Sequence, residues 1–351
     1  MGLTIYFFYN GRREEKMRRQ LLTVIVICTS TLIFCLSGCT KGKQRLQEIS
    51  LTEDLSIGVE SGDERFMFAD IGSVSLDSEE NIYILDWKDS KIKKFDKDGN
   101  FLQSLEVKRG EGPREASYIT GMAVTPKGKI FALDRNTGKI LVFDEEFEWV
   151  RSFNTDFRSI NILPYSEEEF IILGIKDENV FHVFDQGGNL LESFGETFEI
   201  PSEYLQYENM PLTKLPRRAD ITRDGRIYLV NLHKYEIRVY KDKEVHHIIK
   251  EESEFFTPFK VVVSEKSDDG VQRIGMRFPY ISVLEQGKRL YVSMLAWEED
   301  ELNHLDVLEN EKLIASLKIV GFAHAIDEQG RLYLVEKEDY PRVVRATIEF
   351  K

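Results

Sequence analysis

The chain is short of cysteine. Of its 351 residues only Cys28, Cys35 and Cys39 are cysteines, and all three lie before residue 40. A disulfide framework and a cysteine-ligated metal site are therefore excluded for everything downstream.

Several catalytic motifs are also missing. The sequence contains no Gly-x-Ser-x-Gly elbow, no His-Glu-x-x-His and no P-loop. Gly110-x-Gly112 is followed by Pro113 and opens no helix, so it is not a dinucleotide fingerprint. His246 and His247 are adjacent, and on a strand their side chains would point to opposite faces. The sequence predicts no catalytic residue, no metal site and no cofactor.

Positive charge is scarce too. The formal net charge is −14, and residues 1–38, with five basic and two acidic side chains, would leave −17 when removed. Such a surface repels nucleic acid, because that binding depends on neutralising phosphates. With 42% hydrophobic and 11% aromatic residues the chain is nevertheless typical of a folded globular protein.

The N-terminus has the pattern of an export signal. Arg18 and Arg19 precede the apolar run Leu21–Leu36, which is short for the roughly 20 apolar residues of a membrane span. Leu36-Ser37-Gly38-Cys39 resembles the bacterial lipobox, which implies lipidation at Cys39. We expect a signal peptide with an upstream extension at 1–38, a lipidated tether at 39–47 and a folded domain at 48–351. An ordinary N-terminal membrane anchor is the alternative.

The folded domain consists of repeated strand patterns. In 120–153 four short runs alternate apolar and polar residues and are separated by turn residues, as in an antiparallel four-stranded sheet. Such a sheet cannot bury its own faces and needs neighbours of its own kind. The same unit recurs, with first strands expected at Ser73–Asp77, Met122–Val124, Ser159–Leu163, Arg218–Thr222, Tyr280–Leu284 and Ala323–Asp327.

These six units predict an all-β fold, a six-bladed β-propeller of four-stranded antiparallel blades. Equivalent positions of the second strands carry Tyr83, Phe131, Ile171, Tyr228, Tyr291 and Tyr333. The sixth unit stops one strand short at Val343–Phe350, so we expect the N-terminal strand near Glu48–Ile57 to close the ring. Seven blades are the alternative; a β-sandwich does not account for the repeated turns and aromatic positions.

One unit carries a specific resemblance. Asn81–Asp86, followed by Lys91–Asp96 and Asp98-Gly99-Asn100, is similar to an NHL-type repeat, and Arg109–Glu115 is similar to a connector of six-bladed propeller lipoproteins. The chain thus resembles a family of six-bladed β-propeller lipoproteins with NHL-like repeats, largely of unknown function. That family implies a cell-envelope location, with the membrane as a partner through Cys39 and a glycan, peptide or envelope protein as ligand. We expect an outer-membrane lipoprotein that faces the periplasm.

The order of strands predicts which face binds. Turns between first and second and between third and fourth strands are short, whereas the connections on the opposite face are long: Lys108–Tyr118, Gly195–Arg217, Glu251–Pro279 and Leu295–Leu302. Binding residues concentrate on long loops of a rigid scaffold. The residues that enter the innermost strands would line a channel mouth there: Asp70, Tyr118, Arg158, Arg217, Arg218, Arg277, Tyr280 and His324.

Four arginines on so acidic a chain suggest an anion or carboxylate site, although they could instead pair with Asp70, Asp220 or nearby acids. We therefore expect a propeller that binds a ligand or partner protein through its long-loop face. A metal-dependent hydrolase or lyase of the lactonase-like propeller type is the alternative, with Asp70, Asn161 and Asp220 as its candidate ligands. A purely structural platform without a small-molecule pocket is the third reading.

Overall fold

The computed structural model describes residues 46–208, 213–263, 274–295 and 303–351. Cys39 and the rest of the expected signal and tether up to Arg45 lie outside these residues, as does most of the expected loop Leu295–Leu302. Leu46–Lys351 forms one compact unit. No helix in the described ranges is both long and apolar enough to span a membrane.

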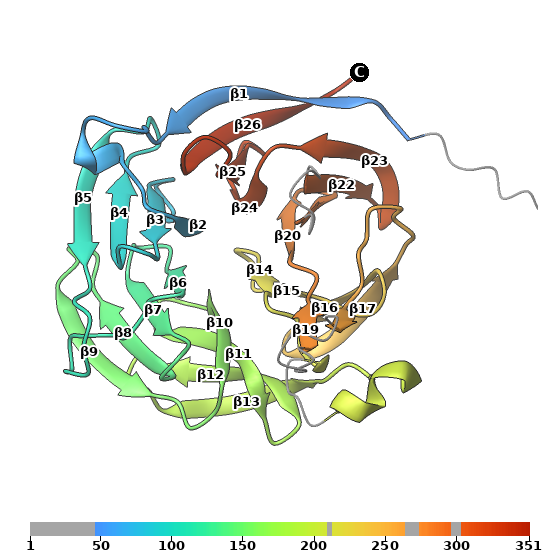
Figure 1. Cartoon of the computed structure of the whole chain (residues 1–351), viewed down its shortest axis with the longest axis horizontal. Coiled ribbons are helices and arrows are strands. Elements are labelled where there is room, and N and C mark those ends of the chain that lie inside the picture. Colours follow the sequence, from blue (N-terminus) through green and yellow to red (C-terminus); the bar gives the residue numbers. More distant parts are fainter. Residues whose placement is uncertain (1–45, 209–212, 264–273, 296–302) are drawn as a thin grey trace, which may run out of the picture. The chain divides into compact units, whose positions relative to one another are not determined.

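Six four-stranded antiparallel sheets surround a common axis, which confirms the predicted propeller (Figure 1). Each sheet is one blade, and its first strand lies innermost. Blade 1 consists of β2 (Ile71–Leu76), β3 (Ile82–Asp86), β4 (Lys91–Phe95) and β5 (Phe101–Glu106). Blade 2 consists of β6 (Gly121–Val124), β7 (Ile130–Asp134), β8 (Lys139–Phe143) and β9 (Trp149–Asn154). Blade 3 consists of β10 (Ser159–Pro164), β11 (Glu169–Lys176), β12 (Asn179–Asp185) and β13 (Leu190–Glu196).

The second half repeats the unit with longer links. Blade 4 consists of β14 (Asp220–Ile221), β15 (Ile227–Val230), β16 (Glu236–Lys241) and β17 (Glu244–Lys250). Blade 5 consists of β20 (Ile281–Gln286), β21 (Arg289–Met294), β22 (Asn303–Glu309) and β23 (Lys312–Ile319). Blade 6 consists of β24 (Phe322–Ile326), β25 (Leu332–Glu336), β26 (Arg342–Phe350) and β1 (Ile49–Ile57).

The N-terminal strand closes the ring as expected. β1 pairs antiparallel with β26 from Ile57↔Val343 to Ile49↔Phe350. Arg345 of β26 donates from Nε to Asp54 Oδ1 at 2.8 Å and from Nη1 to the carbonyl of Lys97 in blade 1 at 2.6 Å. One side chain therefore links β26 both to the closing strand and to the neighbouring blade.

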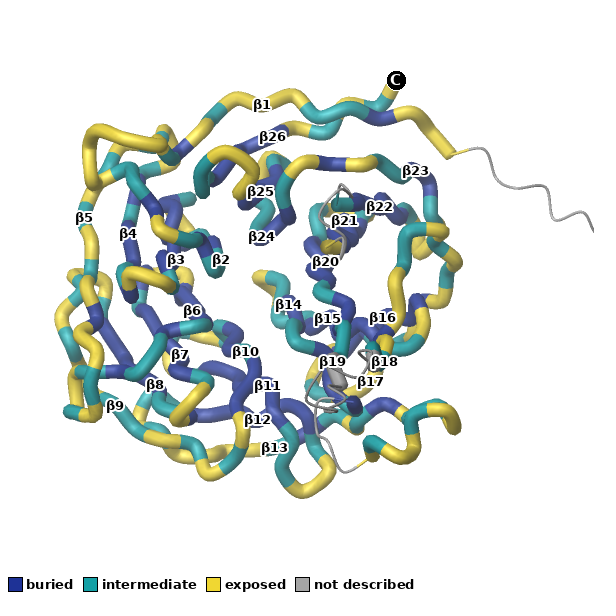
Figure 2. The backbone as a smooth tube through the Cα atoms, viewed as in Figure 1, coloured by how far each residue is buried: buried dark blue, intermediate teal, exposed yellow. Residues whose placement is uncertain are grey.

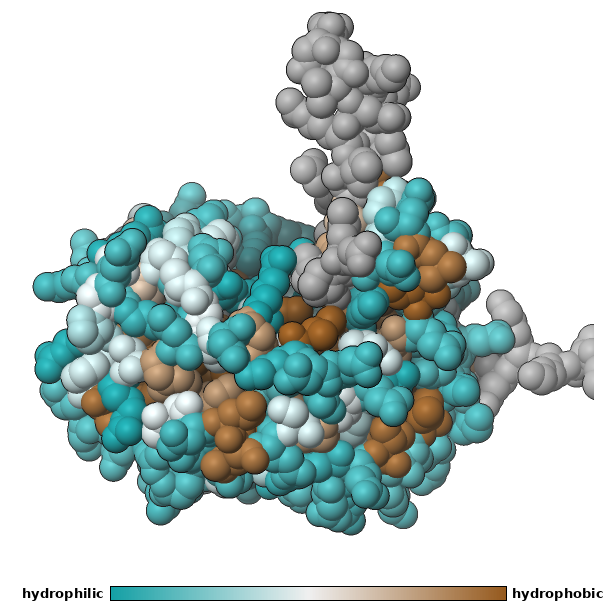
Figure 3. Space-filling view, turned by 90° about the horizontal axis from the view of Figure 1, so that it is seen from below, coloured by the Kyte–Doolittle hydropathy of each residue, from teal (hydrophilic) through white to brown (hydrophobic). Residues whose placement is uncertain are grey.

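The core lies between blades. The inner and middle strands are mostly buried and the outermost strands alternate with solvent (Figure 2). The six expected positions of the second strands are all buried, with exposures from 0% for Tyr83 to 5% for Tyr291. In a side view the surface is mostly hydrophilic, with small separate hydrophobic groups (Figure 3). Burial between blades thus supplies the stability that a single sheet lacks.

Two expectations about the links need correction. The expected strand Arg218–Thr222 is only Asp220–Ile221, and Thr222 already forms the turn that is closed by hydrogen bonds to Arg226. The stretch Glu251–Pro279, expected to be loop, contains a hairpin of β18 (Lys260–Val263) and β19 (Ile274–Arg277). Two 3-10 turns, η1 (Glu64–Phe66) and η2 (Ser202–Tyr207), lie in other links.

Candidate functional site

Three arginines converge at the end of the axis on the face that carries the blade links. Arg158 directly precedes β10, Arg217 lies three residues before β14, and Arg135 directly follows β7. Arg135 interacts electrostatically with both of the others and with Tyr280, which directly precedes β20. Blades 2 and 5 are opposite in a ring of six, so the interaction between Arg135 and Tyr280 spans the axis. We call Arg135, Arg158 and Arg217 the three-arginine cluster.

The cluster is electrostatically unbalanced. Burial lowers the pKa of Arg135 from its ordinary value; Tyr280 acts against this effect, and Arg217 and Arg158 add to it. Burial, followed by repulsion from Arg158, likewise lowers the pKa of Arg217. The Nε atoms of Arg135 and Arg217 are buried and have no hydrogen-bond partner in the described part of the chain. Arg135 and Arg217 are partly buried, and Arg158 is exposed. Partly buried cations that repel one another and have Nε atoms without acceptors are costly, and an anion would relieve that cost.

Aromatic rings pack against Arg217 and Tyr280 beside the three-arginine cluster. The guanidinium of Arg217 lies 4.6 Å from the centroid of the Phe278 ring. The Tyr280 ring lies 5.0 Å from that of Phe322 in blade 6. A ring face attracts a cation without neutralising its charge, so Arg217 is positioned and remains available to an anionic group.

Arg218 has a different role from its neighbour. Its Nε donates to Asp220 Oδ1 at 2.8 Å, and its Nη2 donates to the carbonyl of His324 at 2.9 Å. Burial alone would lower the pKa of Arg218, but Asp220 outweighs that effect and raises it above its ordinary value. Asp220 Oδ2 also accepts from the backbone of Val283 at 2.8 Å, which joins blades 4 and 5. Arg218 is therefore paired with an acid, as in the alternative interpretation, and the Arg218–Asp220 pair connects blades 4, 5 and 6.

His324 lies beside that pair and is neutral. Burial, then Arg218 and Lys337, lower its pKa well below the ordinary value. Its Nδ1 lies 3.3 Å from Arg218 Nη1; because the guanidinium can only donate, Nδ1 is the acceptor and the proton is on Nε2. His324 can therefore offer a neutral N–H donor and adds no charge.

The remaining expected residues lie around this centre with partners of their own. Asp70 is paired with Lys337 at 2.5 Å and with Lys88 at 3.4 Å. The ring of Tyr118 packs against that of Trp87 at 5.4 Å in a tilted arrangement and lies under the guanidinium of Arg109 at 4.7 Å. Arg277 ends β19, opposite Lys260 in the added hairpin.

The three candidate metal ligands are engaged elsewhere. Asp70 is held by lysines and Asp220 by Arg218, while Asn161 Oδ1 lies 3.4 Å from the backbone nitrogen of Ala219. Within the described ranges no group of three or more His, Cys, Asp or Glu side chains is arranged to hold a metal ion. Carboxylates paired with cations make a poor cage for another cation, so this donor set does not fit the lactonase-like alternative.

Arg135 was not predicted from the sequence. Its loop, Arg135–Gly138, is short, and the prediction considered only the long loops. The order of strands could have indicated Arg135, because every loop between a second and a third strand lies on the blade-link face.

Comparison with known proteins supports the fold. The model of a family described as "6-bladed beta-propeller" (DUF5128) matches residues 61–335. A DUF4221 member from Bacteroides vulgatus superimposes with a TM-score of 0.57 at 12% identity, covering 88% of this chain and 100% of that one. A Bacteroides fragilis protein described as exported gives 0.54 at 11% identity, with 89% and 98% covered. A streptogramin B lyase gives 0.51 at 11% identity, with 86% and 98% covered. No protein of curated function matches the chain significantly. At these identities the likeness to solved structures concerns the fold alone.

Proposed function

Since the chain belongs to the DUF5128 family of six-bladed β-propellers, we propose that it is a lipid-anchored protein of the bacterial cell envelope that binds an anionic ligand at the three-arginine cluster. One observation carries the binding proposal. Arg135, Arg158 and Arg217 share one end of the axis, repel one another and have no carboxylate partner in the described residues. Arginine forks suit carboxylate, sulfate and phosphate groups, which accept two parallel hydrogen bonds.

The ligand carries more than one negative charge. Three guanidinium groups converge from blades 2, 3 and 4, and the nearby phenol of Tyr280 and imidazole of His324 supply neutral polar groups. A ligand at this point contacts several blades at once. A short anionic glycan or peptide that presents a terminal charged group to the axis fits this arrangement, with the rest of the ligand over the blade links.

The envelope location rests on the N-terminus and on the neighbours. Leu36-Ser37-Gly38-Cys39 supplies the lipidation signal, and residues 39–47 would form the lipidated tether to an outer membrane whose periplasmic side the propeller faces. The Bacteroides fragilis neighbour described as exported supports the same location.

Anion titration tests the binding proposal. Because Leu46–Lys351 is a compact unit of its own, residues 40–351 can be produced without the leader. At constant ionic strength, sulfate and phosphate should raise the Tm relative to chloride. Arg158→Gln should weaken the effect about tenfold in apparent affinity, since a charge-assisted hydrogen bond contributes about 1.5–3 kcal/mol.

Arg151→Gln is the matched control, because Arg151 is also an exposed arginine but lies on the outer strand β9. An equal response of the wild type, Arg158→Gln and Arg151→Gln would refute the cluster as the binding site. Elemental analysis of the same preparation tests the alternative: stoichiometric divalent metal would favour the hydrolase or lyase.

A further inference from the structure

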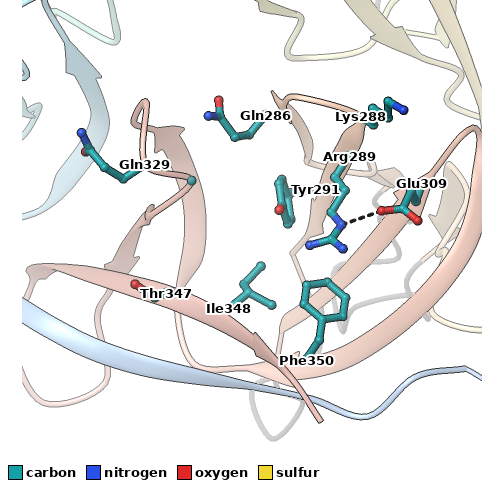
Figure 4. Close-up of a pocket in the computed structure, with 10 residues that line it drawn as sticks. Gln286, Lys288, Arg289, Tyr291, Glu309, Gln329, Thr347, Ile348 and Phe350 are labelled. Atoms are coloured by element: carbon teal, nitrogen blue, oxygen red, sulfur yellow. Dashed lines mark hydrogen bonds and ion pairs between the residues drawn. The ribbon is translucent and has the colours of Figure 1, made fainter.

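A pocket of about 380 Å³ lies between blades 5 and 6 on the short-turn face, away from the three-arginine cluster. Arg289 and Tyr291 of β21 and Phe350 at the end of β26 line it, with Gln286 at the end of β20 and Gln329 in the turn after β24 beside them (Figure 4). The reason for this pocket lies in the way blade 6 is closed.

At each of the other five junctions the turn between the third and fourth strands of one blade contacts the preceding blade. The contacts are Lys97 with Arg345, Phe147 with Tyr83, Gln186 with Lys129, Lys243 with Tyr165, and Glu311 with His247. Blade 6 has no such turn, since its third strand β26 and its fourth strand β1 come from the two ends of the propeller. There β26 pairs with β1 directly, and the backbone nitrogen of Lys351 donates to the carbonyl of Glu48 at 3.0 Å.

The junction of blades 1 and 2 shows what the missing turn would contribute. Tyr83 and Tyr291 are equivalent second-strand residues. The Phe147 ring lies 6.1 Å from the Tyr83 ring, and Phe147 belongs to the acidic turn Asp144–Glu148. The ammonium of Lys94 lies 5.0 Å from the centroid of the same Tyr83 ring. An acidic turn with an aromatic residue thus fills the equivalent space beside a tyrosine and a lysine.

The pocket between blades 5 and 6 likewise combines a tyrosine with cationic side chains. The Arg289 guanidinium lies 4.0 Å from the centroid of the Phe350 ring, and its Nε donates to Glu309 Oε1 at 2.9 Å. Arg289 therefore neutralises Glu309. The exposed Lys288 at the rim then gives the pocket a net positive charge. The segment that precedes Leu46 in the sequence, Thr40–Arg45, carries Lys41, Lys43 and Arg45, so like charge disfavours it as the occupant.

We propose that the pocket binds an acidic turn of a partner protein, which takes the place of the third–fourth turn that blade 6 lacks. The turn places an aromatic side chain against Tyr291 and its carboxylates near Lys288. Main-chain and ring packing supply affinity, and the charge selects an acidic segment over a basic one. This site is independent of the three-arginine cluster and of the anion bound there.

A peptide from the chain itself is the probe. A cyclised peptide with the sequence of Phe143–Trp149 contains the acidic turn and Phe147. Calorimetry and NMR titration of residues 40–351 should show one-to-one binding that places its shifts around Tyr291 and Phe350. Replacement of the peptide residue that corresponds to Phe147 with alanine should weaken binding at least fivefold.

Lys288→Glu should weaken binding of the unmodified peptide by about tenfold, whereas Lys318→Glu, a charge reversal on the outer strand β23 of the same blade, should not. Failure of the peptide to bind the wild type, or equal binding by both variants, would overturn the proposal. Tighter binding after deletion of Thr40–Arg45 would overturn it too, since the tether would then be the occupant. Neither lysine variant should change the response to phosphate, so failure here is separate from failure of the proposed function.

A circular permutant provides a second test. The turn of blade 1 has five residues, Asp96–Asn100, between the paired Phe95 and Phe101. Lys351 and Glu48 would supply two of five, so a three-residue linker between them restores a turn of that length. With new ends opened between Ser61 and Gly62 in the link after β1, the permutant should fold and lose peptide binding. A folded permutant that binds the peptide as well as the wild type does would refute the missing-turn assignment.

Discussion

At the scale of single residues, the chain separates arginines that stabilise the propeller from arginines that do not. Arg218 and Arg345 each have a carboxylate and a backbone carbonyl within hydrogen-bond distance. Arg135 has a buried Nε without an acceptor in the described residues, and other arginines beside it. Natural proteins accept such strain mainly where a ligand uses it.

Arg135→Met should therefore stabilise the ligand-free propeller. The substitution keeps apolar volume and removes a partly buried charge that repels two others, so the free energy of unfolding should rise by about 1 kcal/mol. Urea denaturation at low salt measures this, and the same variant should lose the stabilisation by phosphate. A loss of stability would instead assign Arg135 a structural role.

At the scale of elements, acidic residues at the ends of second strands position the blade links. Asp134, the last residue of β7, accepts from the backbone nitrogen of Ser117 at 2.7 Å and from that of Tyr118 at 3.2 Å. Asp86, the last residue of β3, accepts in the same way from Ala69 at 2.7 Å and from Asp70 at 3.1 Å. The sheet thus fixes the start of the next inner strand, and with it the residues near the axis.

Asp134→Asn should lower stability in a way that depends on pH. Burial alone would raise the pKa of Asp134, but the hydrogen bonds from Ser117 and Tyr118 outweigh it, and the pKa lies below its ordinary value. A lowered folded-state pKa gives stability that is present above the unfolded pKa of about 3.9 and lost as pH falls through the folded value.

The variant should thus be about 1–3 kcal/mol less stable at pH 7, and the difference should shrink below about pH 4. Denaturation at several pH values measures it. Asp89→Asn, at an exposed carboxylate on the same face, should stay within about 0.5 kcal/mol. A difference for Asp134→Asn that does not vary with pH would contradict the assignment.

At the scale of the whole molecule, the two ends of the propeller meet in blade 6. Closure by β1 removes a free sheet edge, and it also brings Gln47, which pairs with Ala315, to the outer strand of blade 5. Six residues lie between Cys39 and Leu46, so seven Cα–Cα steps connect them. At about 3.5 Å per extended residue the tether reaches roughly 25 Å. A lipidated Cys39 would hold this side of the ring close to a membrane.

Cys39→Ala should release the protein from membranes. Buried acyl chains contribute about 0.8 kcal/mol per CH₂, and without them the described residues offer no helix long and apolar enough to span a bilayer. Labelled palmitate should be incorporated by the wild type and by Cys35→Ala, and not by Cys39→Ala. Equal membrane fractions for all three would assign the anchor to the N-terminal apolar run.

The sequence by itself determined the number of blades, their four strands and the closing strand. These follow from period-2 alternation and Gly-containing turns, which act over a few residues and can be read locally. It also predicted Arg158, Arg217 and Tyr280 at the blade-link face. It did not predict the hairpin β18–β19, because a link between blades leaves its internal pairing to tertiary packing.

Only the tertiary structure decided what each cation near the axis does. Arg217 and Arg218 are adjacent in sequence, yet Arg218 pairs with Asp220 and Arg217 joins Arg135 and Arg158. The pocket beside Tyr291 likewise exists because β26 and β1 meet without a turn. Side chains on opposite blades are brought together when the ring closes. The local sequence therefore does not indicate which side chains lie opposite each other.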